Sequence, residues 1–219
     1  MSIKSNLAAV RKQLMNDTIL VAVSKTKPVS AILEAYQEGQ RIFGENKVQE
    51  MVEKYHEMPK DIHWHMIGHL QRNKVKHIAS FVTLIHGVDN FKLLKEINKQ
   101  AEKQHRIINC LFQIKIASED SKFGMTEQEL TTIIQSEEFL SLEHIRIKGL
   151  MGMATFTDDD SQIKKEFLEL KRLFESLKEV HYPTMNLETL SMGMSGDFKL
   201  AIACGSNMVR IGSTIFGTR

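Results

Sequence analysis

Eight short apolar runs recur along the chain, each followed by a helical pattern or by an interval of helix length. Such alternation predicts βα units, which pair their strands into a parallel sheet. The predicted strands are residues 19–25, 41–45, 63–68, 84–88, 109–116, 145–153, 189–194 and 208–216. Eight units in 219 residues fit a closed (β/α)8 TIM barrel near the small end of its size range. The alternative is an open doubly wound sheet, but no Gly-rich dinucleotide fingerprint follows the first strand.

Charged stretches with helical periodicity separate these runs. They cover residues 34–38, 46–57, 91–104, 127–136 and 162–180, and shorter, less regular stretches lie at 70–78 and 197–204. An additional amphipathic helix over residues 3–15 precedes the first strand. Because there are only three prolines and no low-complexity linker, we expect residues 1–219 to form one domain.

The composition narrows the possible partners and location. The net charge is +2, and basic residues alternate with acidic ones, which argues against a nucleic-acid footprint. No apolar stretch is long enough to cross a membrane, and the charged N-terminus does not resemble a secretory signal. Cys110 and Cys204 lie in apolar surroundings typical of buried thiols in a reducing compartment. We therefore expect a cytoplasmic monomer that binds neither nucleic acid nor membrane.

The first predicted strand ends on a lysine, Lys25. Functional residues of a barrel lie at the C-terminal ends of its strands. Loss of hydration there would lower the pKa of the amine and make it available for a Schiff base. Strand physics alone favours an ordinary solvated lysine, because structural lysines outnumber catalytic ones. Lys27 has the same parity but lies in the loop before Pro28, so we expect it to be the less reactive of the two.

The same rule selects the other strand ends as candidate site positions: residues 45–46, 68–69, 89, 118–124, 194–196 and 212–214. The sequences around strands seven and eight, 191–197 and 210–214, are rich in glycine and hydroxyl residues. Free backbone N–H groups and Ser or Thr hydroxyls suit a phosphate, and barrels commonly bind phosphate between these two loops. The alternative is that both are ordinary turns. Their occurrence together, at strands seven and eight, favours a phosphate site.

Arg210 shares its strand parity with Met208 and Gly212, so this face can point into the barrel. A buried arginine keeps its charge and must find an acceptor. A core carboxylate is one candidate partner. The ring nitrogen or phosphate of a ligand is the other.

Asn46 and the histidines of the third strand are less specific signals. Asn46 with Gln49 resembles a helix capping box, so capping is the first prediction for Asn46 and ligand contact the second. His63, His65 and His69 suggest a metal, but no acidic or cysteine ligand accompanies them at a recognised spacing, and we predict no metal site. His65 is expected to pack near the barrel mouth. A serine hydrolase lacks support, because no Gly-x-Ser-x-Gly motif is present.

Six segments together resemble one family, the pyridoxal phosphate homeostasis proteins (the YggS/PROSC family). They are VAVSKTKP (21–28), FGENKVQE (43–50), WHMIGHLQ (64–71) with Lys74, KGLM (148–151), LSMGMS (190–195) and MVRIGSTIFG (208–217). The resemblance runs from residue 19 to the C-terminus in the same order, which makes it specific where no single motif would be.

This resemblance implies a barrel similar to the N-terminal domain of alanine racemase, with pyridoxal 5′-phosphate (PLP) held as a Schiff base on Lys25. It places Arg210 near the pyridine nitrogen and implies that Asn46 and His65 border the cofactor. It assigns the phosphate contacts to Met194, Ser195, Gly212, Ser213 and Thr214.

The expected function is a PLP carrier or buffer without robust catalysis, which maintains free cofactor and supplies it to PLP-dependent apo-enzymes. A permanently charged arginine opposes protonation of the ring nitrogen, on which the electron-sink chemistry of PLP depends. The chain ends at Arg219, just after the eighth strand, without the second domain and tyrosine base expected of a racemase. Its tyrosines, Tyr36, Tyr55 and Tyr182, fall at no predicted strand end.

Three alternatives stay open on the sequence. A weak PLP-dependent amino-acid racemase would use the same lysine. A cofactor-free Schiff-base aldolase acting on a phosphorylated sugar would use the same lysine and phosphate turns. A protein-binding module has only the acidic run 158–160 and the charged helix 162–180 in its favour, and these are more often a solvated face.

Overall fold

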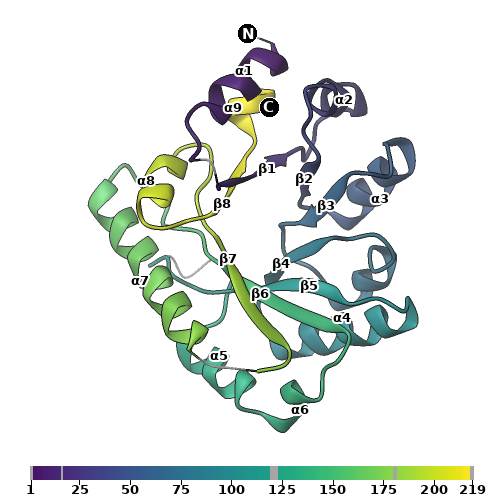
Figure 1. Ribbon diagram of the computed structural model, residues 1–219, viewed down its shortest axis with the longest axis vertical. Helices are drawn as coiled ribbons and strands as arrows, with labels where there is room; N and C mark the ends of the chain where they lie inside the picture. Colours follow the sequence, from purple (N-terminus) through teal and green to yellow (C-terminus); the bar gives the residue numbers. More distant parts are fainter. Residues whose placement is uncertain (1, 16, 119–122, 180–181, 218–219) are drawn as a thin grey trace.

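The computed structural model of the chain describes residues 2–15, 17–118, 123–179 and 182–217. Within these residues eight parallel strands pair in sequence order, and β8 closes the barrel on β1 (Figure 1). The strands are β1 (Ile19–Val23), β2 (Ile42–Glu45), β3 (His63–Met66), β4 (Leu84–Val88), β5 (Ile108–Gln113), β6 (Ile145–Met151), β7 (Met185–Ser191) and β8 (Met208–Ile211). The predicted (β/α)8 barrel is confirmed.

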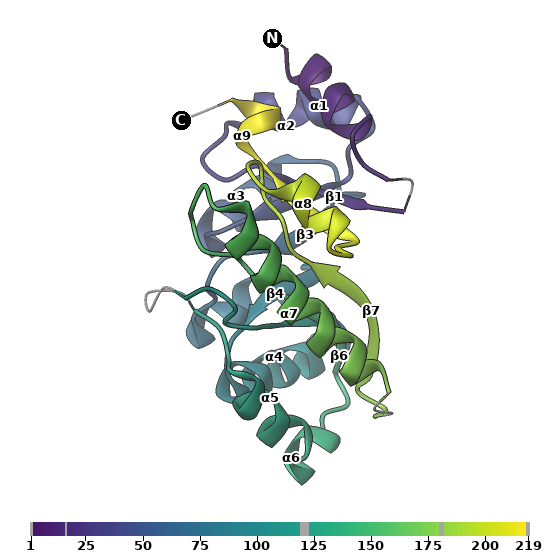
Figure 2. The same ribbon diagram turned by 90° about the vertical axis from the view of Figure 1, so that its left-hand side faces the viewer.

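Helices lie outside this ring of strands (Figure 1). They are α1 (Ile3–Arg11), α2 (Val29–Gln37), α3 (Val48–Glu57), the 3-10 helix η1 (Arg72–His77), α4 (Phe91–Lys103), α5 (Glu127–Ile134), α6 (Glu137–Leu140), α7 (Asp160–Lys178), α8 (Phe198–Ala203) and α9 (Ser213–Phe216). Figure 2 shows α7 lying across β6 and β7, where it buries Phe167, Leu170 and Phe174. Asp159 begins α7 by accepting the backbone N–H groups of Ser161 and Gln162, so the acidic run at 158–160 contains a helix cap.

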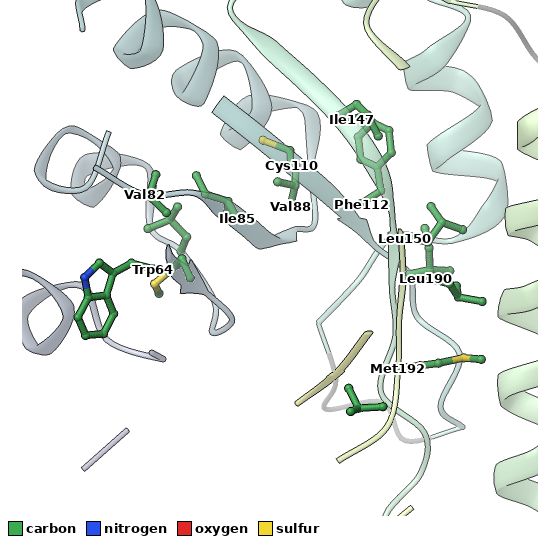
Figure 3. Packing of buried hydrophobic residues seen from close by; sticks show 14 of the residues in the cluster. Trp64, Val82, Ile85, Val88, Cys110, Phe112, Ile147, Leu150, Leu190 and Met192 are labelled. Carbon is green, nitrogen blue, oxygen red and sulfur yellow. The ribbon is translucent and has the colours of Figure 1, made fainter. Parts of the chain in front are cut away.

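Alternate residues of a strand can belong to two different cores. On β5, Cys110 and Phe112 face the helices and pack near Ile147 of β6 (Figure 3). Leu111, between them, belongs to a smaller cluster inside the barrel. The buried members of this inner cluster are Val21, Leu84, Leu111, Met151 and Met208. The run Leu84–Val88 is buried along its whole length, as expected of a parallel strand covered on both faces.

The predicted N-terminal helix is confirmed as α1, although it ends at Arg11. It packs beside α9, the last helix of the described chain (Figures 1 and 2). The side-chain amide of Asn6 donates to the backbone carbonyl of Ile215 at 3.0 Å. The two ends of the described chain are therefore joined next to the loop that follows β8.

Most predicted strands extend two or three residues beyond the observed strand ends, and the largest errors are at strands seven and eight. The strand predicted over 208–216 stops at Ile211, because the backbone turns at Gly212 and Ser213–Phe216 form α9 with Ile215 buried. The β-branched Thr214 and Ile215 favoured a strand by local propensity, and tertiary packing overrode it. β7 begins earlier than predicted and ends at Ser191, before Gly193 takes a φ of +97°. Residues 119–122 of the predicted 118–124 candidate and the predicted helix end at 180 lie outside the described residues.

Candidate cofactor site

Lys25 lies just beyond β1 at the C-terminal opening of the barrel and is half-buried. The backbone N–H of Ser24 donates to the carbonyl of Gly44 at 3.0 Å, so strand pairing continues up to Lys25. Val21 belongs to the inner cluster, and side chains alternate along a strand. This alternation assigns Val21, Val23 and Lys25 to the interior-facing side of the wall.

The turn after Lys25 is strained and is held from α3. Thr26 has a φ of +63°, a left-handed conformation that is unfavourable for a β-branched residue. Its N–H donates to Glu50 Oε1 at 2.5 Å. Lys54 Nζ donates to the same Glu50 oxygen at 2.7 Å and to the carbonyl of Ser24 at 2.8 Å. The side chains of α3 therefore hold the backbone on both sides of Lys25.

A buried carboxylate completes this anchor. Glu45 is fully buried, and its Oε1 accepts from Lys54 Nζ at 2.8 Å and from the Ser24 hydroxyl at 2.6 Å. Burial raises the pKa of Glu45, although Lys54 and Ser24 oppose this effect. We call Ser24, Glu45, Glu50 and Lys54 the turn anchor. Glu45 was among the predicted strand-end positions, but the anchor as a group was not predicted, and its other sequence signal is the i,i+4 spacing of Glu50 and Lys54 on a helix.

Arg210 points into the barrel, as its parity with Met208 predicted. Its Nη1 donates to the backbone carbonyl of Ser191 at 2.9 Å and to the Ser191 hydroxyl at 2.6 Å. Its Nη2 donates to the carbonyl of Gly152 at 3.0 Å. Burial lowers the pKa of Arg210 to about 10, which leaves the guanidinium charged at neutral pH. Among the described residues it forms no carboxylate pair, so the core carboxylate, one of the two candidate partners, is not found.

Two buried histidines continue from the Ser191 hydroxyl across the barrel. His86 Nδ1 lies 3.2 Å from Ser191 Oγ, and His86 Nε2 lies 3.0 Å from His65 Nδ1. Burial lowers the pKa of His65 to about 3 and that of His86 well below its ordinary value, so both rings are neutral at neutral pH. We call Arg210, Ser191, His86 and His65 the interior chain. His65 lies one residue before the C-terminal end of β3. Ser191 begins the run 191–197 predicted to suit a phosphate, but its contact with Arg210 was not predicted, and His86 was not predicted as a site residue.

The loops after β7 and β8 contact each other, as the phosphate prediction requires. The N–H of Gly212 donates to Ser195 Oγ at 3.3 Å. The backbone N–H groups of Ser213 and Thr214 have no acceptor within the described chain, and both side chains are exposed. Met194 fits the prediction less well, because its N–H already donates to Asp197 Oδ1 at 2.6 Å. A phosphate that took this N–H would have to displace a carboxylate.

Asn46 does not cap α3. The helix begins at Val48 with Lys47 at the N-cap position, and no side chain caps it. The capping prediction is therefore wrong, because the chain stays extended for one residue more than the motif suggested. Asn46 is half-buried after β2, and its backbone lies so close to Gly68 that a Cβ there would come within 2.5 Å of the Asn46 carbonyl oxygen. It borders the mouth between the loops after β2 and β3.

The inner wall near the mouth is bare at two glycines. A Cβ at Gly44 would lie 2.9 Å from Val21 Cγ1, and a Cβ at Gly212 would lie 3.1 Å from the Cβ of Val23. Side chains at these positions would crowd the wall below Lys25. The donor set around this wall is an amine, a guanidinium, and hydroxyl and amide groups. It fits the aldehyde, ring nitrogen and phosphate of PLP.

In residues 2–15, 17–118, 123–179 and 182–217, no group of three or more His, Cys, Asp or Glu side chains gathers in a way that could hold a metal ion. No helix in the same ranges combines the length and the apolar character that crossing a membrane requires.

The sequence is similar to proteins of one family over its whole length. The profile of the alanine racemase N-terminal domain matches residues 1–219. A Haemophilus influenzae protein described as a pyridoxal phosphate homeostasis protein is 40% identical over 232 residues, covering 100% of this chain and 97% of the relative.

Solved structures agree with this match. PipY of Synechococcus elongatus, solved with PLP bound, superposes with a TM-score of 0.90 at 33% identity, covering 99% of this chain and 100% of PipY. An alanine racemase of Clostridium difficile superposes with a TM-score of 0.80 at 16% identity, covering 100% of this chain and 57% of the racemase, which shows a shared fold. The chain belongs to the pyridoxal phosphate homeostasis proteins, whose barrel is that of the alanine racemase N-terminal domain.

Proposed function

We propose that this protein binds PLP through Lys25 and serves in PLP homeostasis as a carrier or buffer of the cofactor. The observation that carries the proposal is the arrangement of the barrel mouth, where Lys25 follows an interior-facing strand and Arg210 crosses the interior behind it. PLP, when bound, supplies an aldehyde that condenses with amines and a ring that withdraws electrons.

Each end of the cofactor has a matching group in this chain. The Lys25 amine is the point of covalent attachment. The Ser195, Ser213 and Thr214 hydroxyls, with the N–H groups of Ser213 and Thr214, suit the phosphate. Arg210 uses its two terminal nitrogens for Ser191 and Gly152, which leaves further N–H groups of its five for the ring nitrogen. Asn46 and His65 border the ring, and Met194 and Gly212 complete the phosphate loops.

Borohydride reduction followed by peptide mass spectrometry tests the attachment site. We expect a reduced PLP adduct on Lys25, and complete loss of that adduct and of the visible absorbance in Lys25→Ala. Lys27→Ala is the matched control. Lys27 lies two residues from Lys25 in the chain, and its amine donates to the carbonyl of Gly217. An adduct on another lysine, or one that persists in Lys25→Ala, would contradict the assignment.

We further infer that the protein lacks robust catalytic activity. Arg210 stays charged, so it donates to the ring nitrogen and opposes its protonation. Among the described residues no tyrosine stands at the mouth: Tyr36 bonds Asp61, Tyr55 stacks on Phe81, and Tyr182 packs against Phe139. Chiral analysis of amino acids incubated with the PLP-loaded protein is expected to show no enantiomer exchange. Exchange that disappears in Lys25→Ala would favour the weak racemase instead.

A yellow protein with PLP on Lys25 would also exclude the cofactor-free aldolase, because a lysine alone does not absorb visible light. PLP-dependent apo-enzymes are the proposed recipients of the cofactor. The single domain over 1–219, the monomeric state and the cytoplasmic location stay predictions.

A further inference from the structure

The interior chain has one end whose hydrogen-bonding role is certain. An arginine side chain donates and never accepts. Arg210 Nη1 lies 2.6 Å from Ser191 Oγ, so this oxygen accepts a charge-assisted hydrogen bond from the guanidinium. The hydrogen of the Ser191 hydroxyl is then available to a second partner. His86 Nδ1, at 3.2 Å, is the only other side-chain atom in the described chain within hydrogen-bond distance of that hydroxyl.

The remaining roles follow from this end. A neutral imidazole has one N–H and one acceptor nitrogen. If Ser191 donates to His86 Nδ1, the proton of His86 is on Nε2, and this N–H donates to His65 Nδ1 at 3.0 Å. His65 Nδ1 is then an acceptor, and the proton of His65 must be on Nε2. Each donor from Arg210 to His86 then has an acceptor, the last N–H of the chain is that of His65 Nε2, and the direction is set by the permanent cation.

The opposite direction leaves a buried hydrogen without an acceptor. In that arrangement His65 donates from Nδ1 to His86, and His86 donates from Nδ1 to Ser191. Ser191 Oγ would then accept from both Arg210 and His86, while its own hydrogen would have no acceptor in the described chain. Ser191 is fully buried, so this hydroxyl would have no water to compensate. An unsatisfied buried hydroxyl is unfavourable, because it has lost its hydrogen bond to water and gained none in the protein.

We infer that Ser191 and His86 are positioning residues through which Arg210 holds His65 in the tautomer with its proton on Nε2. This N–H lies on the edge of the imidazole ring turned away from His86. Combined with the proposed function, the inference has a consequence for the cofactor. PLP at the mouth meets two donors joined by one hydrogen-bonded chain, the charged Arg210 and the neutral His65, and His65 can recognise only an acceptor atom.

Long-range ¹H–¹⁵N NMR of the full chain, labelled with ¹⁵N-histidine, measures the tautomers directly. Without PLP at neutral pH we expect His65 and His86 each to be a single neutral tautomer protonated on Nε2. His63 is the internal control. It lies two residues before His65, its side chain is exposed, and it is expected to average between its two neutral tautomers. A His86→Gln variant assigns the signals. Nδ1 protonation of either buried ring, or exchange between its tautomers, would overturn the inference.

Variants at Ser191 separate positioning from simple packing. Ser191→Ala removes the hydroxyl that sets the direction, so both rings are expected to become mixtures of tautomers. Ser191→Thr retains a hydroxyl and is expected to restore the single form. Unchanged tautomers in a folded Ser191→Ala protein would overturn the role of Ser191, and the wild-type spectrum decides the direction even if this variant does not fold.

Adding excess PLP tests the consequence for the cofactor. The His65 Nε2–H resonance is expected to shift while the signals of His63 do not. An unchanged His65 resonance in protein that carries PLP would contradict the assigned contact. Failure of the protein to take up PLP would contradict the proposed function. It would not affect the tautomer assignment, which is measured in the PLP-free protein.

Discussion

Lys54→Met is expected to lower the free energy of unfolding by about 3–5 kcal/mol, because it leaves a buried carboxylate without its cation. Lys54 is 6% exposed and Glu45 is fully buried. Methionine fills a volume similar to that of lysine, so packing is largely kept. The substitution removes the charge and the three hydrogen bonds of the Lys54 amine. Urea unfolding at neutral pH measures the difference. Because Lys54 also bonds the carbonyl of Ser24 and the Glu50 oxygen that accepts from Thr26, PLP attachment at Lys25 is expected to weaken in the same variant.

Lys4→Met is the matched control for this prediction. Lys4 pairs with Glu38 at 2.9 Å, but its side chain is 72% exposed, and such a pair contributes about 0–1 kcal/mol. Adding Glu45→Gln to Lys54→Met removes the isolated buried charge and is expected to recover part of the loss. If Lys54→Met and Lys4→Met were equally mild, the turn anchor would have no special role in stability.

Acid is expected to destabilise the fold steeply, well before most carboxylates titrate. Burial holds the pKa of His65 at about 3 and that of His86 well below 6.5. Below about pH 6.5 the unfolded chain binds protons on these histidines and the folded chain does not, so the free energy of unfolding falls as the pH falls. Each histidine contributes about 1.4 kcal/mol per pH unit. The two together should remove about 4 kcal/mol between neutral pH and about pH 5.

Comparison of variants isolates this effect from the other titrating groups. Urea unfolding across this pH range is expected to show a slope about 1.4 kcal/mol per pH unit shallower in His65→Gln than in the wild type. His77→Gln changes an exposed histidine of η1 and is expected to keep the wild-type slope. The raised pKa of Glu45 acts in the opposite direction, because the folded chain takes up that proton more readily, but it is common to all three proteins. Equal slopes in the three would contradict the neutral-histidine assignment.

Much of the fold was predictable from local pattern. A parallel strand such as Ile19–Val23 is a continuous apolar run, and the βα alternation leaves few topologies to choose from. The errors occurred where local pattern and packing disagree. The run at Ser213–Phe216 has strand propensity but forms a helix that packs against α1. Asn46 has the form of a cap, but α3 begins two residues later.

Parts of the candidate site were predictable for a related reason. Lys25 and the loops joined by Ser195 and Gly212 follow strands, and parallel strands bring their C-terminal ends to one side of a barrel. The partners of Arg210 were not predictable. Ser191 and His86 lie 105 residues apart in the chain, and neither belongs to a motif with a known spacing. A histidine inside the apolar strand Leu84–Val88 was the one available signal, since a buried imidazole needs partners.

The sequence by itself determined the barrel, the strand-end lysine and the family to which the chain belongs, because periodicity and ordered motifs are properties of local sequence. Only the tertiary structure decided how the buried charges are satisfied. Glu45 faces α3 and pairs with Lys54. Arg210 instead crosses the interior to two carbonyls and a hydroxyl, and that hydroxyl leads to two neutral histidines. Hydrogen bonds of this kind depend on which atoms meet within about 3 Å when the barrel closes, and closure brings together residues that no spacing along the chain relates.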